Sequence, residues 1–221
     1  MARNGDRFRR SDPALDEPFQ GHRGFAWLWE RMVRHEDPRE RAMRKYVTGG
    51  VTGRVLEIGV GVGANWPYLP EGIDYVGIEP DPYMRRRAER HKDGRDLPVL
   101  PDRAEALSFP DESFDTVFTT LTFCSVQQPD RALEEVRRVL KPGGQFRFFE
   151  HLRPPGRITG RLADFITPAW KRAGGGCHPN RRTVQAIEAA GFTITERRGF
   201  SLGPVPMAAG VAIPIPLRVW W

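Results

Sequence analysis

Three alternate glycines after a short apolar run form the segment of this chain best suited to hold a ligand. Gly59, Gly61 and Gly63 directly follow residues 54–58, whose valine, leucine and isoleucine are typical of a short strand buried on both faces. A ligand can approach the backbone of such a turn closely, because no side chains stand in the way. Glu57 lies near the carboxyl end of the strand, where open α/β sheets bind their ligands.

Two kinds of ligand fit such a turn. With Ala64 after the glycines, the spacing satisfies the looser dinucleotide fingerprint, and Glu79 stands twenty positions after Gly59 as a ribose acceptor. A carboxylate at Glu57, however, would repel a pyrophosphate. S-adenosylmethionine carries a sulfonium and an ammonium but no phosphate. We therefore expect S-adenosylmethionine, with Glu57 near its cationic end and Glu79 on the ribose hydroxyls; a glycine-rich turn without a ligand is the plain alternative.

Strand-like and helix-like segments alternate around this turn. The pattern predicts strands over residues 54–60, 74–79, 98–102, 114–123, 145–150, 193–200 and 207–213. It predicts helices after Gly63, over 82–91 and 130–140, and within 157–190. This alternation indicates an α/β fold with a Rossmann-like, seven-stranded, mostly parallel sheet and helices on both faces. The last connection is too short for a crossover, so the final strand must run antiparallel.

The N-terminal part of the chain differs from this core. Residues 1–22 mix charged residues, proline and glycine without periodicity and are expected to form a flexible tail. Residues 23–50 contain two helical patterns, the second capped by Asp37, which could form a lid over the glycine turn. Packing of these helices on the sheet, or contact with a membrane surface, is an equal alternative. Residues 51–221 then form the α/β domain.

Composition sets the class of protein. Charged residues make up 28% and hydrophobic residues 39% of 221 residues, as in globular proteins, and no run approaches the roughly eighteen apolar residues of a membrane span. The two cysteines favour a reducing compartment, so a cytoplasmic location is expected. The net charge of +6 comes almost wholly from arginine spread along the chain, so no nucleic-acid partner is expected.

Three segments together resemble the successive motifs of class I S-adenosylmethionine-dependent methyltransferases. They are residues 56–63, residues 104–115 and residues 138–144, and their order and spacing cover most of residues 50–200. The resemblance implies S-adenosylmethionine as cofactor, a small-molecule methyl acceptor, and a donor methyl facing the end of the fourth strand. The cofactor-binding residues that it implies are Glu57, Gly59, Gly61, Gly63, Asn65, Glu79, Ala104, Glu105 and Thr122.

A narrower resemblance points to the methyltransferase-like proteins that include the animal alkyl-thiol S-methyltransferases. It rests on residues 63–65, 124–126, 149–151, 167–170 and 176–177. Those animal proteins begin with a hydrophobic anchor, whereas this chain begins with polar residues, so peripheral membrane contact is the most that is expected. Ubiquinone- and menaquinone-type C-methyltransferases share the broader motifs. The resemblance therefore favours a thiol acceptor and leaves a quinol, phenol, amine or lipid-like acceptor as the alternative.

Methyl transfer to a thiol depends on the thiolate, which nearby positive charge or a base must favour. His151 is the catalytic candidate, and His178 is a second histidine that could act in this way. Cys124 is expected to pack in an apolar strand end, and Cys177 beside His178 is weak support for a metal, so no metal site is expected.

Two other functional classes remain open. The first is a nucleic-acid methyltransferase. The signature of amino-group DNA methylation is absent after the fourth strand, where Thr122 to Ser125 stand, and this absence disfavours that class without excluding it. A non-catalytic protein that binds the cofactor and acts through an interface would keep the same glycine turn. The proline-rich residues 213–216 and the aromatic residues 219–221 could line an acceptor pocket or contact another subunit.

Overall fold

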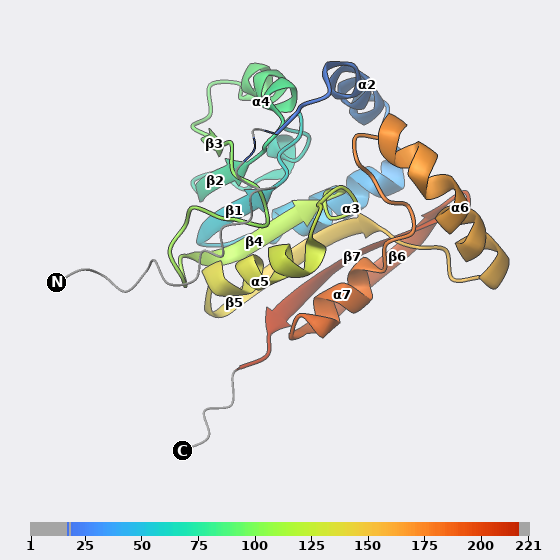
Figure 1. Cartoon of the computed structure of the whole chain (residues 1–221). Coiled ribbons are helices and arrows are strands. Elements are labelled where there is room, and N and C mark those ends of the chain that lie inside the picture. The colour runs from blue at the N-terminus through green and yellow to red at the C-terminus, as the bar shows by residue number, and fades with distance from the viewer. Residues whose placement is uncertain (1–16, 18, 217–221) are drawn as a thin grey trace.

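A computed structural model of the chain describes residue 17 and residues 19–216. Most of the expected N-terminal tail and the aromatic residues 219–221 lie outside this part. Within it, one seven-stranded sheet forms the centre of the molecule (Figure 1). Its strands are β1 (Arg54–Ile58), β2 (Asp74–Ile78), β3 (Val99–Leu100), β4 (Phe114–Thr120), β5 (Leu140–His151), β6 (Phe192–Leu202) and β7 (Val205–Pro214).

The order of the strands is β3-β2-β1-β4-β5-β7-β6. The first five in this order pair in parallel, as the expected crossovers require. β7 pairs antiparallel with both β5 and β6, and it enters the sheet between them. A tight turn at Gly203, whose φ is +55°, joins β6 to β7. The Rossmann-like fold class and the antiparallel final strand are thus confirmed.

Helices cover both faces of the sheet (Figure 1). The helical elements are α2 (Arg23–Arg34), α3 (Pro38–Gly49), η1 (Trp66–Tyr68), α4 (Pro82–Ala88), η2 (Glu89–His91), α5 (Pro129–Val139), α6 (Arg157–Ala173) and α7 (Thr183–Ala189). α5 and α7 pack on one face, where Leu133 and Ile187 join Phe146 of β5 in the larger core. α3 packs on the other face, where Val47 joins Phe149 in a second core.

α2 lies at the edge of the sheet beside α4 rather than on a face (Figure 1). Ala26 of α2 packs with Val62 of the glycine turn and Met84 of α4. The nearly buried carboxylate of Glu30 forms ion pairs with Arg87 and His91, which tie α2 to the end of α4. The lid role expected for residues 23–50 stays a prediction, as does the division of the chain at residues 22 and 50.

Two expected elements differ in the structure. The helix predicted after Gly63 is wrong, because the chain runs through turns and forms only the 3-10 helix η1, which Pro67 and Pro70 keep short. The helical region over residues 157–190 is two helices separated by a glycine-rich connection, Gly174 to Gly176. None of the helices in the described residues is long and apolar enough to cross a bilayer.

Candidate active site

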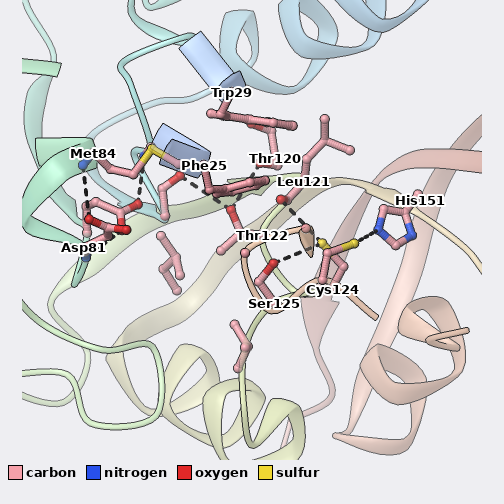
Figure 2. Close-up of a pocket in the computed structure, with 18 of the residues that line it drawn as sticks. Phe25, Trp29, Asp81, Met84, Thr120, Leu121, Thr122, Cys124, Ser125 and His151 are labelled. Carbon is pink, nitrogen blue, oxygen red and sulfur yellow. Dashed lines mark hydrogen bonds between the residues drawn. The ribbon is translucent and has the colours of Figure 1, made fainter. Parts of the chain in front are cut away.

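A pocket of about 500 Å³ lies at the carboxyl ends of the parallel strands. Its volume is within the range of roughly 300–1,000 Å³ that is usual for small-molecule sites. Figure 2 shows Asp81 and Met84 at one end of the pocket, His151 and Cys124 at the other, and Thr122 between them. Phe25, Trp29 and other apolar side chains form much of the wall. The pocket can therefore hold one long ligand, or two ligands in contact.

The glycine turn and Glu79 are joined directly. Gly59 and Gly61 both line the pocket with positive φ angles of +75° and +59°. The backbone N–H of Gly61 donates to Glu79 Oε2 at 2.9 Å, and the N–H of Asp81 donates to Glu79 Oε1 at 2.9 Å. Each carboxylate oxygen keeps a further acceptor position, so Glu79 can accept from hydroxyl groups of a ligand.

Asp81 holds the neighbouring backbone in place. Its side chain accepts from the N–H groups of Tyr83 and Met84 and so caps α4. It also accepts from the N–H of His22, which lies just before α2.

Burial raises the pKa of Glu79 to about 7, against the lowering effect of its two backbone hydrogen bonds.

Three of the expected cofactor-binding residues lie behind the pocket wall. Glu57 is fully buried; its carboxylate accepts from the hydroxyl of Tyr75 and from Asn65 Nδ2. Burial raises the pKa of Glu57 to about 7, although these hydrogen bonds oppose the shift. A Cβ at Gly63 would come within 2.8 Å of the Trp66 ring, so this glycine allows close packing behind the turn. Direct contact of these three residues with a cofactor stays a prediction.

Arg44 of α3 is a pocket residue that the sequence analysis did not find. It is only 2% exposed, and its Nη1 donates to Asn65 Oδ1 at 2.8 Å and to Thr120 Oγ1 at 2.7 Å. Its Nε donates to Glu36 Oε1 at 2.9 Å. Arg44 is also among the residues that line the pocket, so its guanidinium, already paired with Glu36, is a candidate partner for a ligand carboxylate.

Ala104 and Glu105, both expected to bind the cofactor, line the pocket. Glu105 Oε1 accepts from the N–H groups of Gln127 and Gln128 at 2.8 and 3.2 Å. The carboxylate thus ties this loop to the segment before α5. Direct contact of these two residues with the cofactor stays a prediction.

The end of β4 adopts an unusual conformation beside Thr122. Leu121 has a φ of +54°, a region that costs a residue with a side chain roughly 1–2 kcal/mol. The buried carboxylate of Glu150 holds the turn that follows, because its Oε1 accepts from the N–H groups of Thr122 and Phe123 at 3.0 Å each. Burial raises the pKa of Glu150 to about 7. Strain of this kind is common where a ligand must meet the backbone at one fixed place.

Cys124, His151 and Cys177 meet at the far end of the pocket. One ligand atom from each, two sulfurs and a ring nitrogen, all lie within 4.8 Å of one another. His151 Nε2 is 3.1 Å from Cys177 Sγ. His178, the second candidate, instead places its Nδ1 3.1 Å from the carbonyl oxygen of Cys124. His151 thus lies among sulfur atoms, in contact with the pocket.

This end of the pocket favours a thiolate. Hydrogen bonds from Cys124 and then His151, together with the positive charge of His151, lower the pKa of the Cys177 thiol to about 4, although burial opposes them. Burial alone would lower the pKa of His151, but the hydrogen bond and charge of Cys177 outweigh it and raise that pKa. The hydrogen bond to Cys177 and burial raise the pKa of Cys124, so the two thiols do not ionise together.

Comparison with known proteins agrees with this arrangement. The model of a family described as "Methyltransferase domain" matches residues 56–148. Human thiol S-methyltransferase TMT1B is 34% identical over 179 residues, which cover 76% of this chain and 73% of the human protein. The chain belongs to the S-adenosylmethionine-dependent methyltransferases. Other members act on other acceptors by name: phosphatidylethanolamine N-methyltransferase of Cereibacter sphaeroides is 36% identical over 120 residues, covering 52% of this chain and 58% of that protein.

A solved structure also resembles this methyltransferase. It is a Thermotoga maritima protein described as an S-adenosylmethionine-dependent methyltransferase and possible histamine N-methyltransferase. It is 25% identical, covers 86% of this chain and 97% of its own, and superposes with a TM-score of 0.61. This chain, like these relatives, is therefore an enzyme whose cofactor is S-adenosylmethionine.

The pocket suits that cofactor. Glu79 offers carboxylate oxygens for ribose hydroxyls, and Arg44 offers a cation for the methionine carboxylate. A Cβ added at Gly61 would contact only Trp29, at 3.5 Å, so the space in front of this backbone is open. When bound, S-adenosylmethionine supplies the methyl group.

Proposed function

We propose that this methyltransferase transfers the methyl group to the sulfur of a small, apolar thiol. The observation that carries the proposal is the 3.1 Å contact between His151 Nε2 and the sulfur of Cys177, which shows that this end of the pocket places a histidine beside a sulfur atom. A histidine in this place favours a thiolate over a thiol, and the thiolate is the form that attacks a methyl carbon. The name of the human relative, a thiol S-methyltransferase, supports the same acceptor class.

The roles of the side chains follow from this proposal. Glu79 holds the ribose, Arg44 holds the carboxylate, and Ala104 and Glu105 border the adenine. Thr122, at the turn fixed by Glu150, lies between the donor end and the sulfur-rich end of the pocket (Figure 2). His151 favours the acceptor thiolate. Because the reaction is an in-line displacement, alignment of two reactants in one pocket supplies much of the acceleration.

The apolar walls support an acceptor with an aliphatic or aromatic body. Ile166 and Trp170 of α6 line the pocket together with Phe25 of α2. α6 also presents Ile158 and Phe165 to solvent, at 84% and 83% exposure. These exposed side chains support peripheral contact with a membrane, from which an apolar thiol could reach the pocket. Flotation with phospholipid vesicles tests this point: Phe165→Ser should reduce the bound fraction, and an unchanged fraction would contradict it.

We place the reaction in the cytoplasm. Two cysteines that stay as thiols at the site suit a reducing compartment. Fractionation of cells that produce the chain would test this location.

Transfer of a labelled methyl group to a mixed panel tests the acceptor class. The panel contains alkyl thiols, hydrosulfide, phenols, quinols, amines and nucleic acid. The proposal expects label on thiols, with a large loss of rate in His151→Gln and little loss in the matched variant His178→Gln. Label on quinols or amines alone would leave the fold and the cofactor site in place but overturn the acceptor. Tight cofactor binding with no transfer to any member would favour a non-catalytic role.

A further inference from the structure

We propose that Cys124, His151 and Cys177 bind one Zn²⁺ ion and leave its fourth position open to the pocket. Two thiolates and one imidazole are ligands that zinc binds in proteins, and three protein ligands with one open position are typical of catalytic zinc sites. The three ligand atoms lie within 4.8 Å of one another, and the histidine nitrogen lies 3.1 Å from one sulfur. Zn–S bonds of about 2.3 Å and Zn–N bonds of about 2.1 Å place tetrahedral ligands about 3.6 Å apart, so small side-chain shifts suffice.

The three ligands come from separate segments that the fold holds together. Cys124 follows the strained end of β4, His151 ends β5, and Cys177 follows the glycine-rich end of α6. The N–H of His178 donates to the carbonyl oxygen of Cys124 at 2.8 Å, so the two cysteine-bearing segments are bonded to each other next to the site. Met207 of β7 pairs with His151 and fixes its backbone. The protein thus arranges the ligand set before a metal arrives.

The open position faces the place where a thiol acceptor would lie. All three ligand residues line the pocket, and Cys124 is only 3% exposed, so an ion held by them would lie at the pocket wall. Nδ1 of His151 is buried without a hydrogen-bond partner among the described residues. Nε2 already faces Cys177, so its position makes it the ring nitrogen for the metal.

A role for the metal rests on the proposed thiol acceptor. A thiol bound to zinc loses its proton at neutral pH, because the cation stabilises the thiolate. On metal binding, any protons on the two cysteine sulfurs and on Nε2 of His151 leave to solvent, and the acceptor thiol releases its own proton when it binds. The acceptor sulfur then forms a bond to the methyl carbon as the bond from that carbon to the sulfonium breaks. No oxidant or reductant is needed.

Cobalt substitution tests the metal site without measuring activity. The chain has only two cysteines, so any thiolate-to-Co²⁺ charge-transfer absorption must come from Cys124 or Cys177. Titration of the metal-free enzyme with Co²⁺ should give this absorption at one equivalent, together with the strong visible bands of tetrahedral Co²⁺. Competition with Zn²⁺ should remove both. No such absorption, with both thiols still open to alkylation in the presence of Zn²⁺, would overturn the site.

Variants locate the ligands. Cys177→Ser and His151→Gln should each weaken Zn²⁺ binding on the order of 100-fold or more, while the matched control His178→Gln should bind as the unchanged enzyme does. Circular dichroism shows which variants are folded. If a cysteine variant does not fold, protection of the unchanged enzyme's two thiols by Zn²⁺ takes its place. Equal Zn²⁺ affinity in Cys177→Ser, or a Cys124–Cys177 disulfide in place of metal binding under reducing conditions, would contradict the proposal.

Ethanethiol separates the metal site from the proposed function. Addition of ethanethiol to the Co²⁺ enzyme should shift the visible bands if the acceptor takes the fourth position, and an unchanged spectrum would contradict that step. Methylation of ethanethiol at an unchanged rate after complete removal of metal would overturn the role of zinc and leave the thiol methyltransferase in place. A full Co²⁺ signal with no methylation of any thiol would leave the metal site in place and overturn the proposed thiol acceptor.

Discussion

The backbone N–H of Gly61 donates to the carboxylate of Glu79 at 2.9 Å, so the glycine turn after β1 and the acidic end of β2 form one unit. In the sequence these two residues stand eighteen positions apart. In the fold they lie side by side, because β1 and β2 are parallel neighbours and both end at the pocket. A change in either residue should therefore affect the cofactor more than it affects the fold.

Gly61→Val should abolish or strongly weaken binding of S-adenosylmethionine. A Cβ has room in the free protein, 3.5 Å from Trp29 Nε1, but the valine methyl groups would occupy space in the pocket. The left-handed φ of +59° adds a stability cost of roughly 1–2 kcal/mol. Gly72→Val is the matched control, since Gly72 has a φ of +72° and no neighbouring atom within 4 Å of a Cβ. Calorimetry should find cofactor affinity lost only in Gly61→Val; equal affinity in both variants would refute this placement of the cofactor.

Glu79→Gln should weaken S-adenosylmethionine binding by roughly 1–3 kcal/mol, because an amide cannot accept on both sides of the group. Glu188→Gln, on the exposed side of α7, controls for a change of net charge. Calorimetric titration of the two variants measures the difference. Identical affinities would move ribose recognition to another residue.

Arg44→Met should weaken S-adenosylmethionine binding but spare 5′-methylthioadenosine, which lacks the amino acid part. The reason is that Arg44 offers its cation to the carboxylate of the cofactor. The comparison of two ligands on one variant removes effects of misfolding, including the loss of the Glu36 ion pair. Similar losses for both ligands would show that Arg44 only supports the structure through Asn65 and Thr120.

Between about pH 4.5 and about pH 7, stability should fall less steeply with rising pH in Glu57→Gln than in the unchanged enzyme. Glu57 has a pKa raised by burial to about 7, so the folded state holds a proton that the unfolded state releases near pH 4.5. The stabilisation is complete below the unfolded pKa and is lost as pH rises through the folded one. Glu79 and Glu150 act in the same direction, whereas Cys177, whose pKa is lowered to about 4, opposes them. Urea unfolding at several pH values measures the slope; parallel curves for the two proteins would contradict the assignment.

Sequence patterns predicted the strands and their mostly parallel pairing, because strand and helix periodicity are local and a helix between two strands implies a crossover connection. Gly59, Gly61 and Glu79, which these patterns assigned to one ligand site, all line the pocket, and their contact with the cofactor stays a prediction. The helix expected after Gly63 did not form, because two prolines and packing of Trp66 outweigh the helical pattern.

Residues that meet only through the fold were harder to predict. Arg44 bonds to Thr120, 76 positions away, and no local motif marks either residue. Cys124 and Cys177 lie on different segments, so the short spacing rules for metal ligands do not detect them together with His151. Of the three residues of this cluster, the sequence marked His151 as the catalytic candidate. Burial and charge then decide what these groups do, and neither can be read from one sequence.

The place of β7 between β5 and β6 affects how the chain can fold while the ribosome is still synthesising it. When residues up to β6 have emerged, β5 still has an open edge, and β6 has no partner in its final position. Both β6 and the remaining edge of β5 can be paired only once β7 has been made. Since Val205 and Met207 line the pocket, a nascent chain can assemble its cofactor half well before its acceptor half. The donor site is therefore the part of the enzyme that could meet its ligand during synthesis.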